Sequence, residues 1–72
     1  MEKTIRDMHK NLKEGCYIGF VSANDEYDFG LRKQDDFNFV DEKTLVINRK
    51  SGRTTIVNLN LIIGICIRAE LI

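Results

Sequence analysis

The sequence predicts a mainly β domain with one N-terminal α-helix. From residue 16 onward, short runs alternate between apolar and polar residues, and this period of two is typical of half-buried strands. A glycine-containing polar turn, Lys50–Arg53, separates two such runs, which predicts a β-hairpin. Before residue 16, Ile5, Met8 and Leu12 are spaced three and four residues apart. That spacing places them on one face of a helix.

The helix is expected over residues 4–14. Thr4 can cap its first turn, and Asp7 lies near the positive end of the helix dipole. Two lysines occupy the last turn, where cations are favoured, and Gly15 follows as the left-handed residue that often ends a helix. A helix this short is not stable alone, so its apolar stripe should dock on the rest of the protein.

Four strands are expected in the central part of the chain. They are Cys16–Ala23, Glu26–Gln34, Thr44–Arg49 and Thr54–Leu59. Asn24–Asp28 has the composition of a polar turn, and Tyr27, Phe29 and Leu31 then alternate with polar residues. The state of the segment that follows is left open, because only Phe37 and Phe39 alternate before a turn at residues 41–43.

The last sixteen residues, VNLNLIIGICIRAELI, allow two interpretations. In one, every odd position from Val57 to Leu71 is apolar and the segment forms a single long strand. In the other, the chain breaks near Asn60 into a short helical turn and resumes as the strand Ile63–Arg68. Both place the middle of the segment under cover on two faces, by the N-terminal helix or by a second subunit.

Composition limits the classes of protein. Seventy-two residues make one domain, 1–72, with a small core. Eleven basic residues balance eleven acidic ones, so the excess of positive charge typical of many nucleic-acid-binding proteins is absent. The two cysteines, Cys16 and Cys66, are too few for a secreted disulfide framework and lack zinc-ligand spacing. We therefore expect free thiols, no metal, no cofactor and a cytoplasmic protein.

Nothing in the sequence indicates a membrane protein or an enzyme. The longest apolar run, Leu61–Ile67, is far shorter than the roughly 20 residues of a spanning helix. His9 has no evident nucleophile to serve and is expected at the surface or at the boundary of the core. The acidic side chains could attract a hard cation, but their spacing does not follow a calcium loop and solvated turns are expected. These acidic residues are Asp25, Glu26, Asp28, Asp35 and Asp36.

The order of these elements resembles the Sm-like family, and most of all its bacterial Hfq branch of RNA chaperones. The stretches that carry the resemblance are IRDMHKNLKEG, CYIGFVSANDEYDFGL and TLVINRKSGRTTIVNLNLIIGICI. Asn24 and Gly30 occupy places comparable to the family's turn and strand glycine positions. The resemblance implies a small, strongly bent Sm-like or SH3-like barrel of about five strands over residues 16–70, with the helix before it.

The resemblance also implies that the last strand pairs with the first and that open edges join subunits into a ring. It would place Cys16 and Cys66 on neighbouring strands. Where the Hfq branch has a Tyr-Lys-His signature, this chain has Asn58-Leu59-Asn60.

The candidate contact residues are basic or carboxamide side chains. A basic patch near aromatic rings can hold single-stranded nucleic acid, and asparagines can read base edges. The candidates for contact with nucleic acid or a partner are Arg32, Lys33, Arg49, Lys50, Arg53, Asn58 and Asn60.

Two functions follow from these observations. The first is a non-catalytic binding or regulatory protein that acts as a homo-oligomer and contacts a protein partner. The second is an Sm-like ring that binds single-stranded RNA. Neutral charge and the absent signature favour the first, and the order of elements favours the second.

Overall fold

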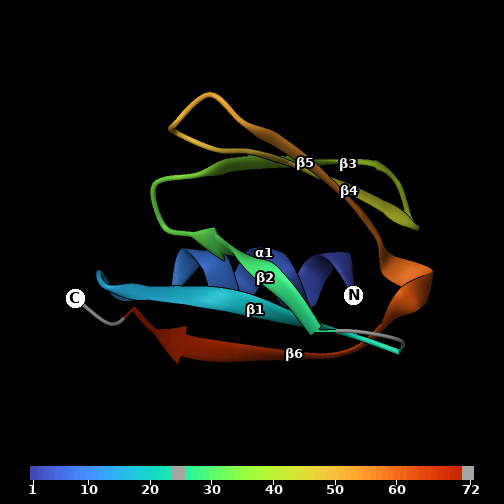
Figure 1. Cartoon of the computed structure of the whole chain (residues 1–72), viewed down its shortest axis with the longest axis horizontal. Coiled ribbons are helices and arrows are strands. Elements are labelled where there is room, and N and C mark those ends of the chain that lie inside the picture. The colour runs from blue at the N-terminus through green and yellow to red at the C-terminus, as the bar shows by residue number, and fades with distance from the viewer. Residues whose placement is uncertain (24–25, 71–72) are drawn as a thin grey trace.

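The computed structural model describes residues 1–23 and 26–70, and of residues 26–29 only the backbone. One helix precedes six strands, which confirms a mainly β fold with an N-terminal helix (Figure 1). The elements are α1 (Glu2–Lys10), β1 (Cys16–Ser22), β2 (Glu26–Arg32), β3 (Asp36–Asp41), β4 (Thr44–Asn48), β5 (Thr54–Asn58), the 3₁₀-helix η1 (Leu59–Leu61) and β6 (Ile62–Ala69). The expected turn at Asn24–Asp28 is too long, since β2 already begins at Glu26. Residues 24 and 25 lie outside the described residues, as do the side chains of Tyr27 and Phe29.

The strands form two three-stranded antiparallel sheets, in the orders β2-β1-β6 and β3-β4-β5. The last strand lies along the first, from the pair Cys16↔Ala69 to the pair Ser22↔Ile62, as expected. Within the described residues no ladder joins the two sheets, so the expected closed barrel of about five strands is not seen. The turn at residues 33–35 separates β2 from β3, and η1 separates β5 from β6.

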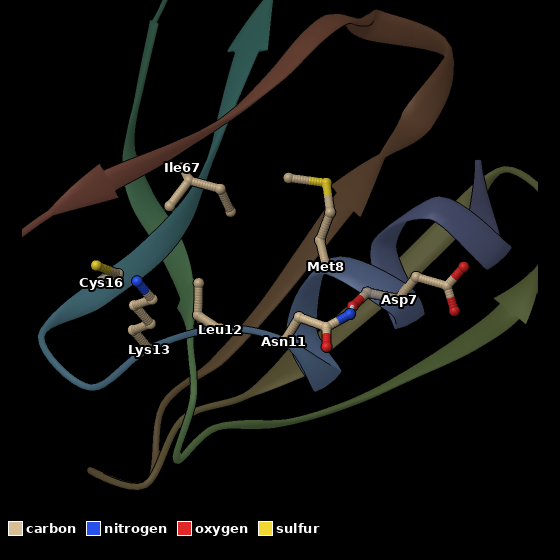
Figure 2. Close-up of a pocket in the computed structure, with 7 residues that line it drawn as sticks. All are labelled: Asp7, Met8, Asn11, Leu12, Lys13, Cys16 and Ile67. Carbon is tan, nitrogen blue, oxygen red and sulfur yellow. Dashed lines mark hydrogen bonds between the residues drawn. The ribbon is translucent and has the colours of Figure 1, made fainter.

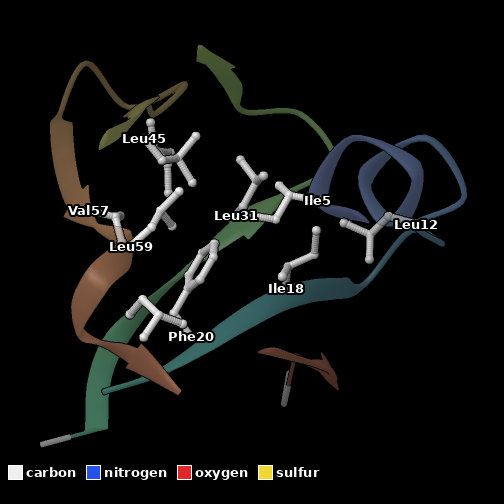
Figure 3. Close-up of a cluster of buried hydrophobic side chains, with 10 residues drawn as sticks. Ile5, Leu12, Ile18, Phe20, Leu31, Leu45, Val57 and Leu59 are labelled. Atoms are coloured by element: carbon white, nitrogen blue, oxygen red, sulfur yellow. The ribbon is translucent and has the colours of Figure 1, made fainter. Parts of the chain in front are cut away.

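The core lies where the two sheets and α1 meet. Side chains from α1 and the turn after it, from β1, β2, β4, β5 and η1, and from the start of β6 converge there (Figure 3). The buried apolar residues are Ile5, Leu12, Ile18, Phe20, Leu31, Leu45, Ile47, Val57, Leu59 and Ile62. Because apolar burial is the main source of stability in a domain this small, these residues hold both sheets and the helix together.

Helix α1 is shorter than expected and ends differently. It begins at Glu2 rather than Thr4, so Thr4 is not its cap, and no side chain caps its start. Asn11 is its C-terminal cap: the backbone N–H of Asn11 makes the last helical bond, to the carbonyl oxygen of Asp7, and its side-chain amide donates to the same oxygen. Gly15 has the left-handed φ of +82°, but it belongs to a later turn and does not end the helix. Asn11, and not Gly15 as expected, therefore ends the helix.

The helix docks on β3 through aromatic contacts. Phe37 and Phe39 are half-buried, and the Arg6 guanidinium lies 5.5 Å and 5.2 Å from their ring centroids. The His9 ring meets Phe37 edge to face at 4.9 Å. His9 is half-buried and its Nε2 lies 3.1 Å from the carbonyl oxygen of Arg32, so this nitrogen carries the proton that is donated. His9 thus lies at the boundary of the core, as expected.

The hairpin predicted around Lys50–Arg53 is confirmed. Strands β4 and β5 pair from Thr44↔Asn58 to Asn48↔Thr54. The Arg49 N–H donates to the Arg53 carbonyl oxygen at 2.7 Å, which closes the loop. Gly52 has φ +100°, a conformation that is strained for any side chain. The turn is therefore specified locally by its glycine.

The C-terminal segment follows the second of the two interpretations. The chain leaves the sheet at η1 and resumes as β6, so the single long strand is wrong. Within the single chain α1 does not cover the middle of the segment on both faces, because Ile63 is 72% exposed and Ile67 is 50% exposed; cover by a second subunit stays a prediction. Ile63 is the extra residue of a bulge between the pairs Ser22↔Ile62 and Val21↔Gly64, which turns its side chain outward. Leu71 lies outside the described residues.

Candidate functional site

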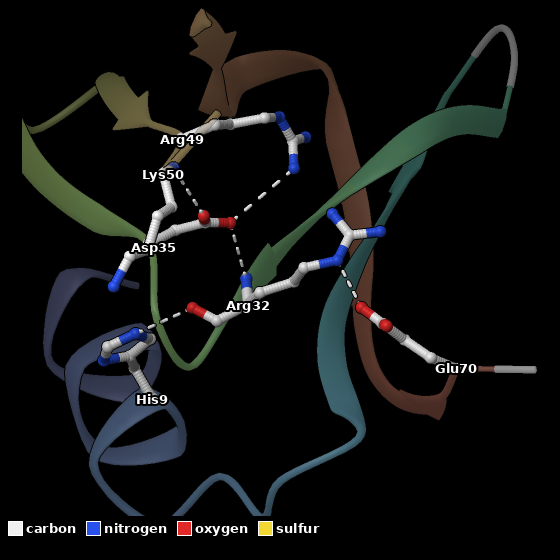
Figure 4. A network of polar contacts seen from close by, with 6 residues as sticks. All are labelled: His9, Arg32, Asp35, Arg49, Lys50 and Glu70. Atoms are coloured by element: carbon white, nitrogen blue, oxygen red, sulfur yellow. Dashed lines mark hydrogen bonds and ion pairs between the residues drawn. The ribbon is translucent and has the colours of Figure 1, made fainter. Parts of the chain in front are cut away.

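A cavity of about 310 Å³ lies between the β2–β3 turn and the tip of the β4–β5 hairpin (Figure 4). We call it the basic pocket, and it is lined by Arg32, Gln34, Asp35, Arg49, Lys50 and Ser51. Three of these side chains are cationic and one is anionic. The pocket brings together residues from the end of β2, the turn after it and the residues that follow β4. Three of the seven candidate contact residues therefore share one site.

The centre of this site is the carboxylate of Asp35, which is only 4% exposed. Its Oδ2 accepts from the Arg32 N–H at 3.1 Å and lies 3.6 Å from Nη1 of Arg49. Its Oδ1 accepts from the Lys50 N–H at 3.2 Å. The expectation that Asp35 lies in a solvated turn is therefore wrong, because three partners replace its water. Asp36, the next residue, is exposed as expected.

The side chain of Arg32 extends from the pocket along the sheet β2-β1-β6. Its Nε donates to Oε1 of Glu70, and its guanidinium lies 5.6 Å from the ring centroid of Tyr17. The ion pair with Glu70 is more than a third exposed on both sides. Solvent screens such pairs strongly, so it holds the guanidinium in place without contributing much stability.

Lys33 and Arg53 lie near the pocket but do not line it. Both side chains are exposed. Lys33 borders a second cavity, of about 510 Å³, together with Glu14, Gln34 and Glu70 among others. Arg53 follows the hairpin turn, where its carbonyl oxygen accepts from Arg49. Arg53 thus adds a cation beside the hairpin tip, whereas Lys33 shares its cavity with two acidic residues.

Asn58 and Asn60 lie at the opposite end of β5 from the hairpin tip (Figure 1). The Oδ1 of Asn58 accepts from the backbone N–H of Asn60 at 3.0 Å, which starts η1. Both side chains are exposed. The structure thus gives Asn58 a local role at the turn and does not bring the two asparagines together with the basic residues.

A different kind of surface runs along the outer strands β5 and β6. Ile56 on β5 is 70% exposed, and Ile63 on β6 is exposed to a similar degree. Each strand has one hydrogen-bonded neighbour in the described residues, β4 for β5 and β1 for β6. Their other sides therefore present unpaired backbone groups next to apolar side chains.

Beside β6 lies an apolar groove of about 490 Å³ (Figure 2). Met8 and Leu12 of the helical stripe, together with Cys16 and Ile67, form its walls. Asp7, Asn11 and Lys13 stand at its rim. The groove explains why Ile67 is half exposed, since α1 covers the inner face of β6 only in part.

The two cysteines are free thiols on neighbouring strands. Cys16 pairs with Ala69 and Cys66 pairs with Gly19, so they are offset along the strands. In this ladder Cys16 shares a face with Ile18, whereas Cys66 faces the other side with Gly19. The geometry thus separates the two thiols.

The described residues contain no group of three or more histidine, cysteine, aspartate or glutamate side chains that could hold a metal ion. In the same part of the chain, no helix is both long and apolar enough to cross a membrane.

Sequence patterns missed the role of Asp35 because only Arg32, among its three partners, is close to it in the chain. Arg49 and Lys50 reach it only after the β3–β4 hairpin has formed. A usable signal was the apolar alternation of Phe37 and Phe39, which places Asp35 directly before a strand.

Comparison of the chain with protein-family models, with curated proteins and with solved structures gave no match in any of the three.

Proposed function

We propose that this protein is a small, non-catalytic binding or regulatory module that acts as a homo-oligomer. Subunits would join through the open edges of β5 and β6. The observation that carries the proposal is the exposure of Ile56 and Ile63 on these two outer strands.

Open strand edges with apolar side chains favour association of a single chain with other chains. Unpaired N–H and C=O groups along an edge form hydrogen bonds with another strand, and soluble proteins usually blunt such edges with charges or proline. Here isoleucines stand at the edges and the chain contains no proline. Fully burying one isoleucine side chain contributes roughly 1.5–3 kcal/mol, so pairing of edges between copies would be favourable.

The two edges differ from one another, which affects the form of the assembly. When β5 of one copy pairs with β6 of the next, the contact is heterologous, and heterologous contacts close into rings if the rotation permits. Such pairing would extend both sheets around the ring and leave no open edge at β5 or β6.

An Sm-like or SH3-like barrel is our proposal for the architecture of each subunit. It is supported by the pairing of β6 with β1, the 3₁₀-helix before β6 and the tight turn between β2 and β3. In that architecture β2 and β3 are two halves of one bent strand.

Molecular mass in solution tests the proposed assembly. Light scattering should give a multiple of the 8.3 kDa chain mass, and Ile56→Asp or Ile63→Asp should reduce it to one chain. Val40→Asp is the matched control, because Val40 is 65% exposed but lies on β3. Wild-type protein that stays at 8.3 kDa at high micromolar concentration would refute the proposal, as would dissociation by the control alone.

The second candidate function is a ring that binds single-stranded RNA, in the manner of the family that the sequence resembles. It is favoured by five basic residues in and around the basic pocket. Three line the pocket, one borders the cavity beside it and one follows the hairpin turn: Arg32, Arg49, Lys50, Lys33 and Arg53. Filter binding with uridine-rich and adenine-rich RNA tests it. Affinity should fall steeply with salt and be lost in a Lys50→Ala, Arg53→Ala double variant but not in a Lys3→Ala, Lys10→Ala double variant. Equal loss in both double variants, or no binding at micromolar protein, would remove this candidate.

The setting of the protein is a further proposal. Two cysteines held apart as thiols are consistent with the reducing cytoplasm.

A further inference from the structure

We propose that the basic pocket binds a phosphate group, presented either by a free nucleotide or by the terminal phosphate of an RNA strand. The pocket is formed by residues of one chain, so this inference does not depend on the proposed homo-oligomer.

The lining of the basic pocket carries a net positive charge. In a chain of zero formal charge, the pocket is lined by the cations Arg32, Arg49 and Lys50 and by the single anion Asp35. Three positive charges and one negative charge leave a net charge of +2 in the lining. A phosphate dianion would neutralise that charge, and arginine and lysine are the side chains that proteins use to hold phosphate.

Although Asp35 lines the pocket, its carboxylate oxygens are bound by groups of the protein. Its two oxygens are taken up by the N–H groups of Arg32 and Lys50 and by the guanidinium of Arg49. One buried carboxylate therefore fixes the backbone at two of the cationic residues and the guanidinium of the third (Figure 4). Cations held in place before a ligand arrives bind it with a smaller loss of entropy.

Several hydrogen-bond donors of the pocket stay available to a ligand. The Lys50 side chain is exposed and makes no ion pair among the described residues. Arg32 uses Nε for Glu70, and a guanidinium has further N–H donors. Gln34 and Ser51 add polar side chains to the lining. A tetrahedral oxyanion could thus receive hydrogen bonds from several directions.

Size restricts the ligand. A cavity of about 310 Å³ is at the lower end of the range of small-molecule pockets, roughly 300–1,000 Å³. It suits one phosphate group with its immediate substituent rather than a long stretch of backbone. This is why we infer a nucleotide or a strand terminus and not an internal segment of RNA.

Glu70 offers a specific way to test the site. Its carboxylate pairs with Arg32, so it competes with a phosphate for the same guanidinium. Glu70→Gln should therefore tighten phosphate binding. Glu42→Gln is the matched control, because Glu42 is an exposed residue of the β3–β4 turn and its replacement changes the net charge by the same amount.

The experiment is an NMR titration of the full chain with inorganic phosphate, followed by adenosine monophosphate and short RNA with or without a 5′-phosphate. Backbone amide signals at Arg32, Lys50 and Ser51 should shift and saturate. Lys50→Ala should weaken binding roughly tenfold or more, since it removes a charge-assisted hydrogen bond. It keeps the backbone N–H that Asp35 needs, so the fold should be unaffected. Glu70→Gln should strengthen binding severalfold, and Glu42→Gln should not.

The arms of the titration distinguish the two sources of phosphate. Tighter binding of adenosine monophosphate than of 5′-phosphorylated RNA indicates a nucleotide site, and the reverse indicates a strand terminus. No saturable shift with any phosphate probe at millimolar concentration would overturn the proposal. So would RNA binding that is indifferent to the terminal phosphate, or identical affinities in Glu70→Gln and Glu42→Gln. None of these results depends on the mass of the protein in solution.

Discussion

The inner strand β4 and the outer strand β5 carry similar apolar residues that differ in exposure. Leu45 and Ile47 on β4 are fully buried, whereas Ile56 on the neighbouring strand is largely exposed. Ile47 pairs with Thr55, and Ile56 pairs with Val46 across the same ladder, so adjacent residues face the core and the outside. The comparison shows that the face of the sheet, and not the type of side chain, decides whether an apolar residue is buried.

Replacing one isoleucine on each strand gives the largest expected contrast. Ile47→Ala should lower the free energy of unfolding by about 2–5 kcal/mol, because it leaves a cavity in the core. Ile56→Ala should change the stability of the dilute single chain by less than about 0.5 kcal/mol. Urea denaturation at low protein concentration measures both. Similar losses of stability in the two variants would show that the Ile56 side chain is covered within one chain.

Two neighbouring aspartates extend the comparison to charge. Asp35→Ala should cost about 3 kcal/mol, because it leaves the Arg49 guanidinium, with a side chain only 12% exposed, without its carboxylate. Asp36→Ala, at an exposed position, should stay within about 0.5 kcal/mol of wild type. Thermal unfolding followed by circular dichroism would rank the two variants. A tolerated Asp35→Ala would mean that water replaces the carboxylate at the centre of the basic pocket.

Two glycines give a smaller contrast between a covered and an open position. A Cβ at Gly30 would overlap the Tyr17 ring and lie 2.9 Å from the Ile18 carbonyl oxygen, whereas at Gly64 the nearest atom is 3.9 Å away. Gly30→Ala should therefore destabilise the protein by about 1–3 kcal/mol, and Gly64→Ala should not. Chemical denaturation measures the difference. If the Tyr17 ring simply swings away, a Tyr17→Ala background will not reduce the cost of Gly30→Ala.

The smallest effect is expected at Asp41, which is fully exposed. The pKa of this carboxyl is lowered from its ordinary value of 3.8, chiefly because the Lys43 N–H donates to it. The folded state therefore gains stability from this group above the unfolded pKa and loses it as the pH falls through the folded pKa. An NMR titration of the carboxyl should show the low pKa retained in Lys43→Ala and raised in Lys43→Pro, which lacks the N–H. A pKa that rises equally in both would assign the effect to the lysine charge.

Local chemistry explains which parts of the fold the sequence could predict. The β4–β5 hairpin was correct because Gly52 and the alternation beside it lie within a few residues. The break before β6 was one of two open interpretations, and the choice depends on Leu59 being drawn into the core. The start of α1 was missed because Ile5, fully buried, fixes the first turn through packing rather than through a cap.

The candidate site was predictable only in part, for the same reason. Arg49 and Lys50 are adjacent in the chain, so their proximity was evident. Their meeting with Arg32 depends on Asp35, which bonds Arg32 three residues before it and Lys50 fifteen residues after it. Nor can apolarity alone tell Ile47 from Ile56, because exposure is decided by the face of the sheet on which a residue lies: Val57, next to Ile56 on β5, is only 2% exposed.

The single carboxylate between the β2–β3 turn and the β4–β5 tip also has a consequence for motion. The amide protons of Arg32 and Lys50 are both held by Asp35. Neither is released to solvent without loss of a bond to that one side chain. In hydrogen exchange the two amides should therefore lose protection together, as members of one cooperative unit, although Arg32 ends β2 and Lys50 lies in the turn after β4.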